Sequence, residues 1–376
     1  MESVSTIWIG LDVHKDTIAV CRLGGDEQRE EACQIPNDLR AIRKLFGRLA
    51  KQGELRVCYE AGPCGYELRR ELERMSIACE VIAPSLIPRR PGERIKTDRR
   101  DARKLARLYR AGELTTIHVP TAAEEAVRDL VRCRDDLRQD LMRMRHRLLK
   151  FVLRHGRIWR ESRNWTQGHL VWLRSQRFDD LAAQRTFEEY FAQLDFTLDR
   201  VRVLDAELAR VAEQNPWKPL VERLVCLRGI STLSALTLLA EIQDFHRFRS
   251  PRDLMSFVGL VPSLYASGGT ERRGSITKSG NSHVRRILVE AAWQYRHRPQ
   301  WVGRLRQRSQ GQPEAVRAEA MKAQHRLHLR YRRLLGRGKP SQVVCTAIAR
   351  ELCGFVWALL VKHSDPARST TEIHTA

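Results

Sequence analysis

The spacing of apolar residues changes near residue 120, and this change limits the possible folds of the chain more than any other feature. Before it, short apolar runs at 7–12, 17–23, 55–59 and 79–84 predict β-strands, and a tight polar turn joins the first two in a hairpin. An amphipathic helical segment, GYELRRELERM, precedes the last run. Strands that alternate with helices are typical of a three-layer α/β domain, and we predict such a domain over residues 1–118.

Beyond residue 120 the apolar residues follow two heptad stretches. In the first stretch, one heptad position holds Val127, Arg134, Leu141 and Leu148, and the other holds Leu130, Leu137, Met144 and Phe151. In the second stretch, one position holds Phe187, Leu194, Val201 and Leu208, and the other holds Tyr190, Thr197, Leu204 and Val211. We therefore predict a helical coiled-coil region over residues 119–215. The pattern fits an antiparallel hairpin, an oligomerising coiled coil, or two ordinary amphipathic helices packed on one core.

A third part of the chain begins after the proline-punctuated segment NPWKP at 215–219. Apolar helical pieces flank Gly229, and a further helical piece, HVRRILVEAAW, follows a segment rich in glycine, serine and cations. We predict a mainly α-helical domain over residues 216–300 and a basic helical extension over residues 301–363. The polar residues 364–376 are predicted to be a disordered tail.

The charge of the chain points to a polyanionic partner. Its 67 Lys and Arg residues exceed its 45 Asp and Glu residues by 22. Between residues 296 and 339, 13 cations face only Glu314 and Glu319, and residues 89–110 hold ten more cations. Solvated helix faces are often basic, but seldom with so little acid. Because cationic proteins gain affinity by releasing the counterions of phosphates, nucleic acid is the predicted partner.

The cysteines and the apolar runs bear on location. The nine cysteines are scattered singly, without a CxxC pair, which favours reduced structural thiols over disulfides or zinc. The apolar stretch 354–361 is too short to span a bilayer, and no signal-peptide pattern precedes the first strand. We therefore predict a cytoplasmic protein without a membrane partner.

Four carboxylates occupy positions where a site can form. Asp12 and Glu60 each end a predicted strand, and open α/β sheets place their sites outside strand ends. Asp98 and Asp101 are three residues apart at the start of a predicted helix, and therefore project from one face of it. Such acids repel one another unless a cation binds, and oxygen ligands suit Mg²⁺ or Mn²⁺. Alternatively, Asp98 and Asp101 are helix-start acids that pair with the adjacent arginines.

A segment rich in glycine and serine, YASGGTERRGSITKSGN at 265–281, follows the apolar helices. It is a surface loop, a phosphate cradle, or the carrier of a reactive serine, and composition does not choose among Ser267, Ser275 and Ser279. Gly229 also has two interpretations. It turns the chain so that backbone amides meet a phosphate, as in a helix-hairpin-helix, or it is simply a turn between two helices.

Together, these motifs resemble a known family. GLDVHKDTIAV, YEAG and KTDRRDARKLARLYRAGEL resemble the RuvC-like (RNase H-fold) DEDD domain of insertion sequence (IS) 110 family transposases. The stretch from LRGISTLSALTLLAEI through YASGGTERRGSITKSGN to HVRRILVEAAW is similar to the C-terminal transposase domain of that family. The resemblance covers most of residues 5–300. Residues 301–363 resemble the basic extension of some members.

The resemblance implies roles for individual residues. It makes Asp12, Glu60, Asp98 and Asp101 a DEDD site for Mg²⁺ or Mn²⁺. It makes Ser267, which precedes a glycine as in the Ser-Ser-Gly or similar tripeptide of the family, the DNA-attacking nucleophile. The first serine of that tripeptide is replaced here by Ala266, so it cannot be essential in this chain. The residues expected to bind nucleic acid are Arg272, Arg273, Lys278, Arg285, Arg286, Gly229, Lys96, Arg99 and Arg100.

The resemblance also implies partners. A transposase or recombinase of this family acts on donor and target DNA, and a structured non-coding bridge RNA pairs with both. We expect a homodimer or homotetramer near the nucleoid of a prokaryotic cell, with a site that is composite between the two domains. Three alternatives stay open: a junction-resolving metal nuclease that activates water, an actin-like sugar kinase or ATPase, and a nucleic-acid-binding protein with an inactive site.

Overall fold

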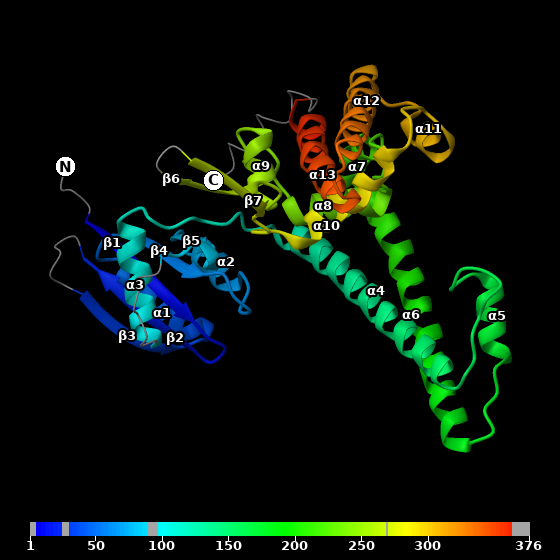
Figure 1. Ribbon diagram of the computed structural model, residues 1–376. Helices are drawn as coiled ribbons and strands as arrows, with labels where there is room; N and C mark the ends of the chain where they lie inside the picture. The colour runs from blue at the N-terminus through cyan, green and yellow to red at the C-terminus, as the bar shows by residue number, and fades with distance from the viewer. Residues whose placement is uncertain (1–4, 25–29, 89–96, 268–269, 363–376) are drawn as a thin grey trace. The chain divides into compact units, whose positions relative to one another are not determined.

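The computed structural model describes residues 5–24, 30–88, 97–267 and 270–362. The chain forms two compact units, residues 1–119 and 120–376, and each is described by itself. The chain is a mixed α/β protein, with the larger sheet in the first unit and most of the helices in the second (Figure 1). The division into five segments stays a prediction, as does the disordered tail, which lies outside the described residues.

The first unit is built on a five-stranded sheet with the order β3-β2-β1-β4-β5. Strand β1 pairs antiparallel with β2 and parallel with β4, which in turn pairs parallel with β5. This order is consistent with a RuvC-like domain. The strands are β1 (Thr6–Val13), β2 (Thr17–Leu23), β3 (Glu30–Pro36), β4 (Glu54–Glu60) and β5 (Ala78–Ile82).

The edge strand β3 was not predicted from the sequence. It pairs antiparallel with β2, and five of its seven residues are exposed. Because its sequence, EEACQIP, has no apolar alternation, periodicity gives no signal for it. Charged side chains on an exposed edge strand also discourage pairing with another chain.

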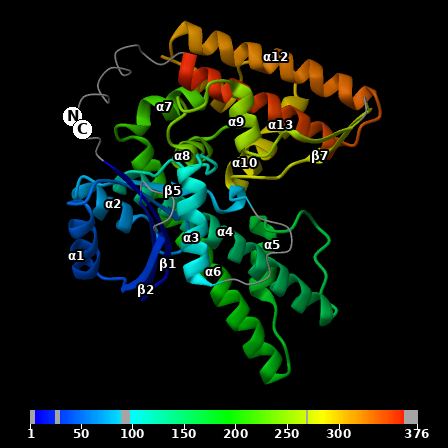
Figure 2. The same ribbon diagram turned by 90° about the vertical axis from the view of Figure 1, so that its left-hand side faces the viewer.

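Helices cover both faces of the sheet (Figure 2). Ile9 and Leu11 of β1 are fully buried in one cluster with Phe46 and Leu72, which come from the helices of one face. The alternate side chains of the strands point to the other face of the sheet, where Cys21 of β2 packs against Ala102. The helices are α1 (Leu39–Leu49), α2 (Glu67–Arg74) and α3 (Asp98–Arg110), with a short 3₁₀ turn η1 (Pro84–Leu86).

Gly10 allows α3 to lie directly on β1. A Cβ atom built on Gly10 would overlap the carbonyl oxygen of Ala102 and the backbone nitrogen of Ala106. These are backbone atoms of a packed helix, and they cannot move aside as a flexible side chain would. The glycine therefore sets the distance between the helix and the strand.

We expect Gly10→Ala to destabilise the first unit by about 1–3 kcal/mol, because the added methyl group pushes α3 away from β1. Urea unfolding followed by circular dichroism measures the change. Gly47→Ala is the matched control, since a Cβ there meets nothing within 4 Å. Gly47 lies inside α1, where alanine gains about 0.5–1 kcal/mol. Equal stability of the two variants would contradict this account of the packing.

The second unit contains a long helical hairpin. Helices α4 (Ala122–Arg154) and α6 (Leu181–Ala212) pack on each other, with α5 (Gln167–Ser175) beside them (Figure 1). Phe151 near the end of α4 contacts Phe187 near the start of α6, so the helices are antiparallel. The heptad residue Arg134 pairs across them with Asp205, at 2.7 Å from Nε to Oδ1. The heptads therefore form a hairpin within the chain, and oligomerisation through them stays a prediction.

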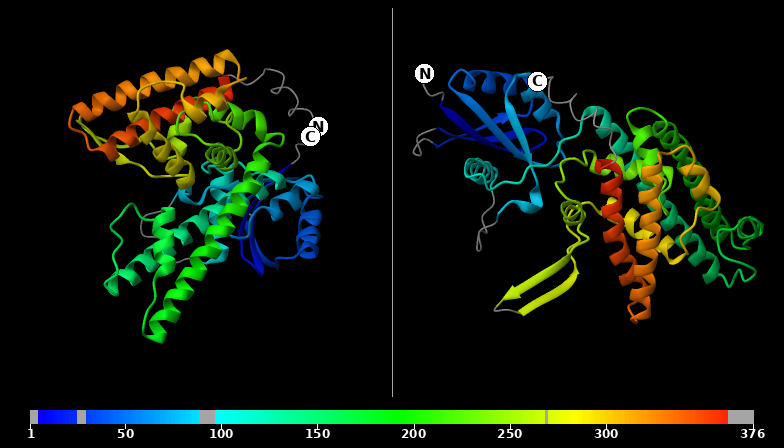
Figure 3. Two further views of the ribbon diagram at one scale, coloured as in Figure 1. Left: turned by 90° about the vertical axis from the view of Figure 1, so that its right-hand side faces the viewer. Right: turned by 90° about the horizontal axis from the view of Figure 1, so that it is seen from above.

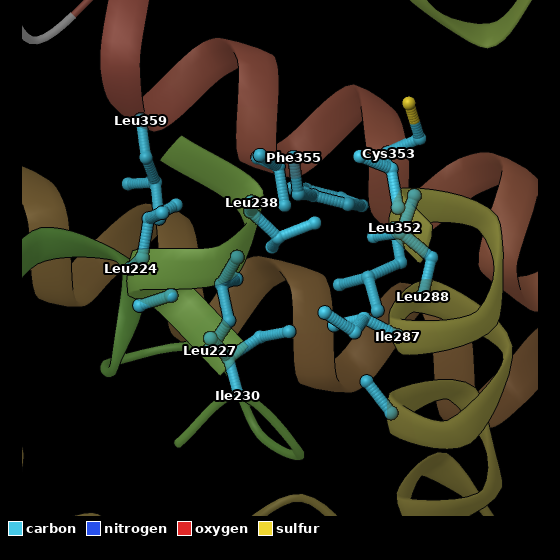
Figure 4. Packing of buried hydrophobic residues seen from close by; sticks show 14 of the residues in the cluster. Leu224, Leu227, Ile230, Leu238, Ile287, Leu288, Leu352, Cys353, Phe355 and Leu359 are labelled. Atoms are coloured by element: carbon cyan, nitrogen blue, oxygen red, sulfur yellow. The ribbon is translucent and has the colours of Figure 1, made fainter. Parts of the chain in front are cut away.

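A helical body adjoins this hairpin in the same unit. Its core includes Leu227 and Leu238 around Gly229, Ile287 of α10, and Leu352 and Phe355 of α13 (Figure 4). The elements are α7 (Trp217–Leu224), α8 (Thr232–Ile242), α9 (Pro251–Phe257), α10 (Ser282–Ala292), η2 (Trp293–Arg296), α11 (Gly303–Ser309), α12 (Glu314–Gly336), α13 (Ser341–Trp357) and the π-helical turn η3 (Ala358–Lys362).

One helical span of the described chain is long and apolar enough to cross a membrane. It is Ser341–Lys362, with a mean hydropathy of 1.8 over its most apolar window. Two thirds of that window (67%) are buried inside the unit, where α13 packs on α10 and α12. This burial explains the composition, because a core helix is apolar on most of its surface.

Most of the segment rich in glycine and serine forms a β-hairpin. Strand β6 (Pro262–Ser267) pairs antiparallel with β7 (Thr270–Ile276), and the hairpin projects from the helices (Figure 3). Of the three alternatives for this segment, an irregular surface loop does not describe these strands, and the other two stay open. A sequence signal for a hairpin was present, because the dipeptide Gly268-Gly269 separates two runs of about equal length.

A buried ion pair joins three helices next to this hairpin. The Glu241 side chain of α8 is fully buried and accepts two hydrogen bonds of 2.8 Å from Arg132 of α4. It accepts a third, of 2.6 Å, from Asn281, which also caps α10. Burial alone would raise the pKa of Glu241, but the hydrogen bonds from Arg132 and Asn281 outweigh it and hold the pKa below its usual value.

We expect Glu241→Gln to lower the free energy of unfolding by about 1–3 kcal/mol, because the charge-assisted hydrogen bonds from the partly exposed Arg132 are weakened. Since the carboxylate has a lowered pKa, its stabilisation is present above the unfolded pKa and is lost as the pH falls through the folded one. Wild-type stability should therefore drop more steeply than that of the variant below about pH 4.5, as measured by thermal unfolding.

Glu290→Gln is the matched control for this prediction. Glu290 is 59% exposed and pairs with Arg286 on the surface of α10. An exposed pair of this kind contributes about 0–1 kcal/mol. If the two variants unfolded at the same temperature and with the same pH dependence, the Glu241 network would have no special role in stability.

Candidate active site

Two of the predicted acids end neighbouring strands of the sheet. In the parallel pair β1 and β4, Leu11 is opposite Tyr59, and Asp12 and Glu60 come next on the two strands. Leu11 and Tyr59 are buried among the residues that face α1 and α2. Because side chains alternate along a strand, Asp12 and Glu60 belong to the opposite face, the one that α3 covers.

Helix α3 brings the other two acids to the same end of β1. Trp8, near the start of β1, packs edge-on against Tyr109 near the end of α3, with ring centroids 5.0 Å apart. Gly10 meets the middle of the helix, so α3 runs antiparallel to β1. Its first turn, which carries Asp98 and Asp101, therefore lies where β1 ends. The Thr97 side chain caps this turn by accepting a hydrogen bond from the Arg100 backbone.

A histidine joins the acids. His14 Nε2 lies 3.3 Å from Asp12 Oδ2 and 3.5 Å from Asp98 Oδ1. Among the described residues, Asp12, His14 and Asp98 are the group whose potential ligand atoms lie within 4.8 Å of one another. Neither Glu60, which ends the neighbouring strand β4, nor Asp101 belongs to this group. His14 was not predicted as a site residue, although it stands two residues after Asp12 in the GLDVHK motif.

The acids repel one another electrostatically. The pKa of Asp12 is raised above its usual value, mainly by burial and also by the charges of Asp101 and Asp98. The His14 side chain acts in the opposite direction. Asp101 is thus close enough to Asp12 to affect its charge. A divalent cation would relieve both the repulsion and the burial cost.

The chemistry of these side chains fits a divalent metal. Carboxylate oxygens are the ligands that Mg²⁺ and Mn²⁺ prefer, and a histidine nitrogen is acceptable to Mn²⁺ and to later transition metals. Three potential ligand atoms, from Asp12, His14 and Asp98, already lie within 4.8 Å of one another. Asp12 and Asp98 would hold such an ion, with His14, Glu60 or Asp101 completing the set.

Ser267 lies in the second unit, at the end of β6. Its backbone is opposite Thr270 of β7, next to the two glycines between the strands. The side chains of Ser267 and Arg273 lie outside the described part of the structure. Arg272 and Lys278 are exposed. Ser267 and the acids lie in different compact units.

The other residues expected to bind nucleic acid have varied surroundings. Arg285 donates hydrogen bonds to the carbonyl oxygens of Val258 and Ser279, at 2.9 and 3.0 Å. Arg286 donates to Asp135 on α4, at 2.9 Å. These bonds give both arginines a structural role, and a role in binding nucleic acid stays a prediction. Beside the acids, Arg99 and Arg100 are exposed, and Lys96 lies outside the described residues.

Two features require a glycine at position 229: its positive backbone angle φ and its close packing against α10. Its φ is +87°, and a Cβ atom there would lie 2.6 Å from the carbonyl oxygen of Ala291 on α10. The glycine borders a hollow of about 440 Å³ that Ser231, Arg304 and Arg308 also line. Such a basic hollow at the start of α8 is compatible with phosphate binding, while the turn itself is explained by contact with α10.

The geometry and the sequence comparisons agree on the class of protein. Residues 9–156, which carry the acids, match the DEDD transposase domain, so the chain is a DEDD-type transposase. Residues 221–306, which include β6 and β7, match the transposase IS116/IS110/IS902 family. The chain belongs to this family, as the resemblance in sequence predicted.

Two relatives illustrate the similarity. The "Putative transposase y4qE" of Sinorhizobium fredii is 42% identical over 367 residues, which cover 97% of this chain and 90% of the relative. The "Transposase for insertion sequence element IS1533" of Leptospira borgpetersenii is 35% identical over 335 residues, 87% of this chain and 96% of the relative. The similarity therefore extends across both compact units.

Proposed function

We propose that this transposase cuts and rejoins DNA through Ser267, assisted by Mg²⁺ at the DEDD acids. The observation that carries the proposal is the convergence of Asp12 and Asp98, from a strand and a helix, on His14. In a member of a transposase family, a cluster of this chemistry is best explained by phosphodiester chemistry. A purely binding protein would not need it, and the matches to transposase families disfavour a kinase.

The acids would hold the metal, and His14 would orient them. Asp12 and Asp98 present carboxylate oxygens at one end of the sheet, where the charge of Asp101 also acts on Asp12 and where the strand β4 ends at Glu60. A bound divalent ion supplies positive charge that stabilises the phosphorane-like transition state. His14, within 3.5 Å of two of the acids, fixes the positions of their oxygens.

The serine step would conserve the number of phosphoester bonds. The Ser267 hydroxyl oxygen attacks a DNA phosphorus atom, and its proton passes to a nearby base or to water. A Ser–O–P bond forms, one ester bond of the DNA breaks, and the departing oxygen leaves as a hydroxyl group. A hydroxyl group of another strand then attacks the phosphoserine and releases Ser267. Arg272 and Lys278, which are exposed near the hairpin, would bind the phosphate.

The two halves of this chemistry lie on different compact units. We propose that the site is composite, with the acids from one protomer and Ser267 from another. We therefore propose a homodimer or homotetramer as the active species. Sedimentation of the protein alone and with DNA tests this part of the proposal.

The net charge of +22 supports extensive contact with phosphate backbones. We propose that a structured bridge RNA pairs with donor and target DNA, so that base pairing supplies the sequence recognition and the protein binds backbones. The expected setting is the prokaryotic cytoplasm, at the nucleoid. A single discrete RNA that co-purifies with the protein would support this, and purification without RNA of an active protein would exclude it.

A covalent intermediate tests the serine chemistry directly. End-labelled donor DNA is incubated with the protein and Mg²⁺, and the products are separated on a denaturing gel. Serine attack predicts a labelled band of protein size that protease converts to a band of DNA size. The competing function is a metal-dependent nuclease that activates water. It predicts cleaved DNA with no protein-linked band at any time point.

A further inference from the structure

The helical hairpin of the second unit contains a cavity that the proposed chemistry does not use. It has a volume of about 300 Å³ and lies between the end of α4, the segment that follows it, and α5. This size is at the lower end of the range for ligand pockets, about 300–1,000 Å³. The cavity therefore suits a ligand about as large as one nucleotide base.

Flat aromatic rings form part of the cavity wall. Trp159, His169 and Trp172 line it, and their ring centroids lie 5.6–5.7 Å from one another. His169 and Trp172 are stacked, with an angle of 22° between their planes. Aromatic rings are the usual surfaces on which unpaired bases stack.

Two buried donors in this wall have no acceptor among the described residues. They are Nε2 of His169, whose side chain is fully buried, and Nε1 of Trp159. The Trp165 backbone N–H donates to His169 Nδ1 at 3.0 Å, so the neutral ring carries its proton on Nε2. Burial lowers the pKa of His169 and thus favours this neutral form. A buried donor without an acceptor is costly, so a ligand with oxygen or nitrogen acceptors would be stabilised here.

The charge around the cavity is positive. His146 and Lys150 are exposed, four residues apart on α4, and both line the cavity, as does Arg157. Of the described residues in its lining, none carries a carboxylate. These features match the parts of a nucleotide. The aromatic wall suits the face of a base, the two unused donors suit its acceptors, and the cations at the rim suit its phosphate.

We propose that this cavity binds one unpaired nucleotide of single-stranded nucleic acid. The base stacks on Trp159 and Trp172, His169 Nε2 donates to a base acceptor, and Lys150 neutralises the neighbouring phosphate. This binding does not depend on the chemistry of Ser267 or of the acids. RNA and DNA both present such a base, and the test below separates them.

Photo-cross-linking of the full-length protein tests the proposal. The probes are 12-nucleotide single strands of RNA and of DNA with one central 5-iodouracil, and a fully paired duplex serves as competitor. Cross-linked peptides are identified by mass spectrometry. We expect cross-links within residues 146–172 that the duplex does not compete away. Trp159→Ala should reduce their yield about tenfold, as expected from the loss of one base-stacking contact.

Phe196→Ala is the matched control, because Phe196 is an aromatic residue of α6 that is 68% exposed and does not line the cavity. It should leave the yield unchanged. Lys150→Ala alters only an exposed side chain and therefore keeps the test valid if Trp159→Ala fails to fold. It should reduce the yield about threefold by removing one phosphate contact. Trp159→Phe should retain most of the cross-linking.

Each outcome decides the matter. Cross-links with the RNA probe alone, with the DNA probe alone, or with both support the proposal and identify the source of the nucleotide. Equal yields for Trp159→Ala, Lys150→Ala and Phe196→Ala would overturn it, as would cross-links that all lie outside residues 146–172. A Trp159→Ala protein with altered mass in solution and unaltered cross-linking would also overturn it, and would indicate that a second copy of the chain occupies the cavity.

Discussion

The Ser267→Ala variant will bind donor DNA as tightly as the wild type and will form no covalent adduct with it. Strand transfer should fall by at least about 10³-fold, because the alternative nucleophile is an unpositioned water molecule. The adduct is measured on a denaturing gel, and binding is measured separately by fluorescence anisotropy. Unchanged binding shows that the loss lies in the chemical step.

The same segment supplies matched controls. Ser275→Ala and Ser279→Ala change serines that follow Ser267 by 8 and 12 residues. The Ser279 hydroxyl lies 3.0 Å from that of Thr277, so it has a local partner within the chain. Both variants should keep the adduct and most of the strand transfer. If Ser267→Ala cleaved DNA as fast as these controls, the water-activating nuclease would be the better description.

The positions of Asp12 and Glu60 could be predicted because strand periodicity carries the information. Apolar residues alternate up to Leu11 and Tyr59, and the breakers Gly62 and Pro63 show where the second strand ends. The helical start at Asp98 was equally visible. Periodicity did not show that α3 packs on β1, because this packing depends on the close approach of the two backbones at Gly10.

Other parts of the site and the fold carried too weak a local signal. His14 contacts Asp98, 84 residues away, only after α3 has packed on the sheet. The expected role of Arg286 in binding nucleic acid stays a prediction, while its hydrogen bond to Asp135, 151 residues away, could not be read from the sequence. The cavity beside Trp159 likewise forms from segments that a heptad pattern does not describe. Residue type indicates the chemistry in these cases, and only tertiary packing supplies the partner.

Replacing Asp12 by asparagine should separate metal binding from folding. Asp12 is half-buried and near the charges of Asp98 and Asp101, which help to raise its pKa. Asparagine keeps the shape and removes one of these repelling charges, so the variant without metal should be at least as stable as the wild type. Strand transfer should fall by about 10²–10⁴-fold, the size expected when charge stabilisation of the transition state is lost.

Thermal unfolding with and without Mg²⁺ or Mn²⁺ gives a second readout that does not depend on activity. A ligand at about 100 times its dissociation constant stabilises the folded state by about 2.7 kcal/mol. The wild type should gain such stability from the metal, and Asp12→Asn should gain little. Asp16→Asn is the matched control, because Asp16 is an exposed acid in the turn between β1 and β2, outside the group formed by Asp12, His14 and Asp98. Two results together would contradict the proposed metal site: Asp12→Asn keeps the metal-dependent rise in unfolding temperature, and it transfers strands at the wild-type rate. In that case Asp12 would bind no catalytic ion, and the acids at the end of β1 would have no part in the chemistry.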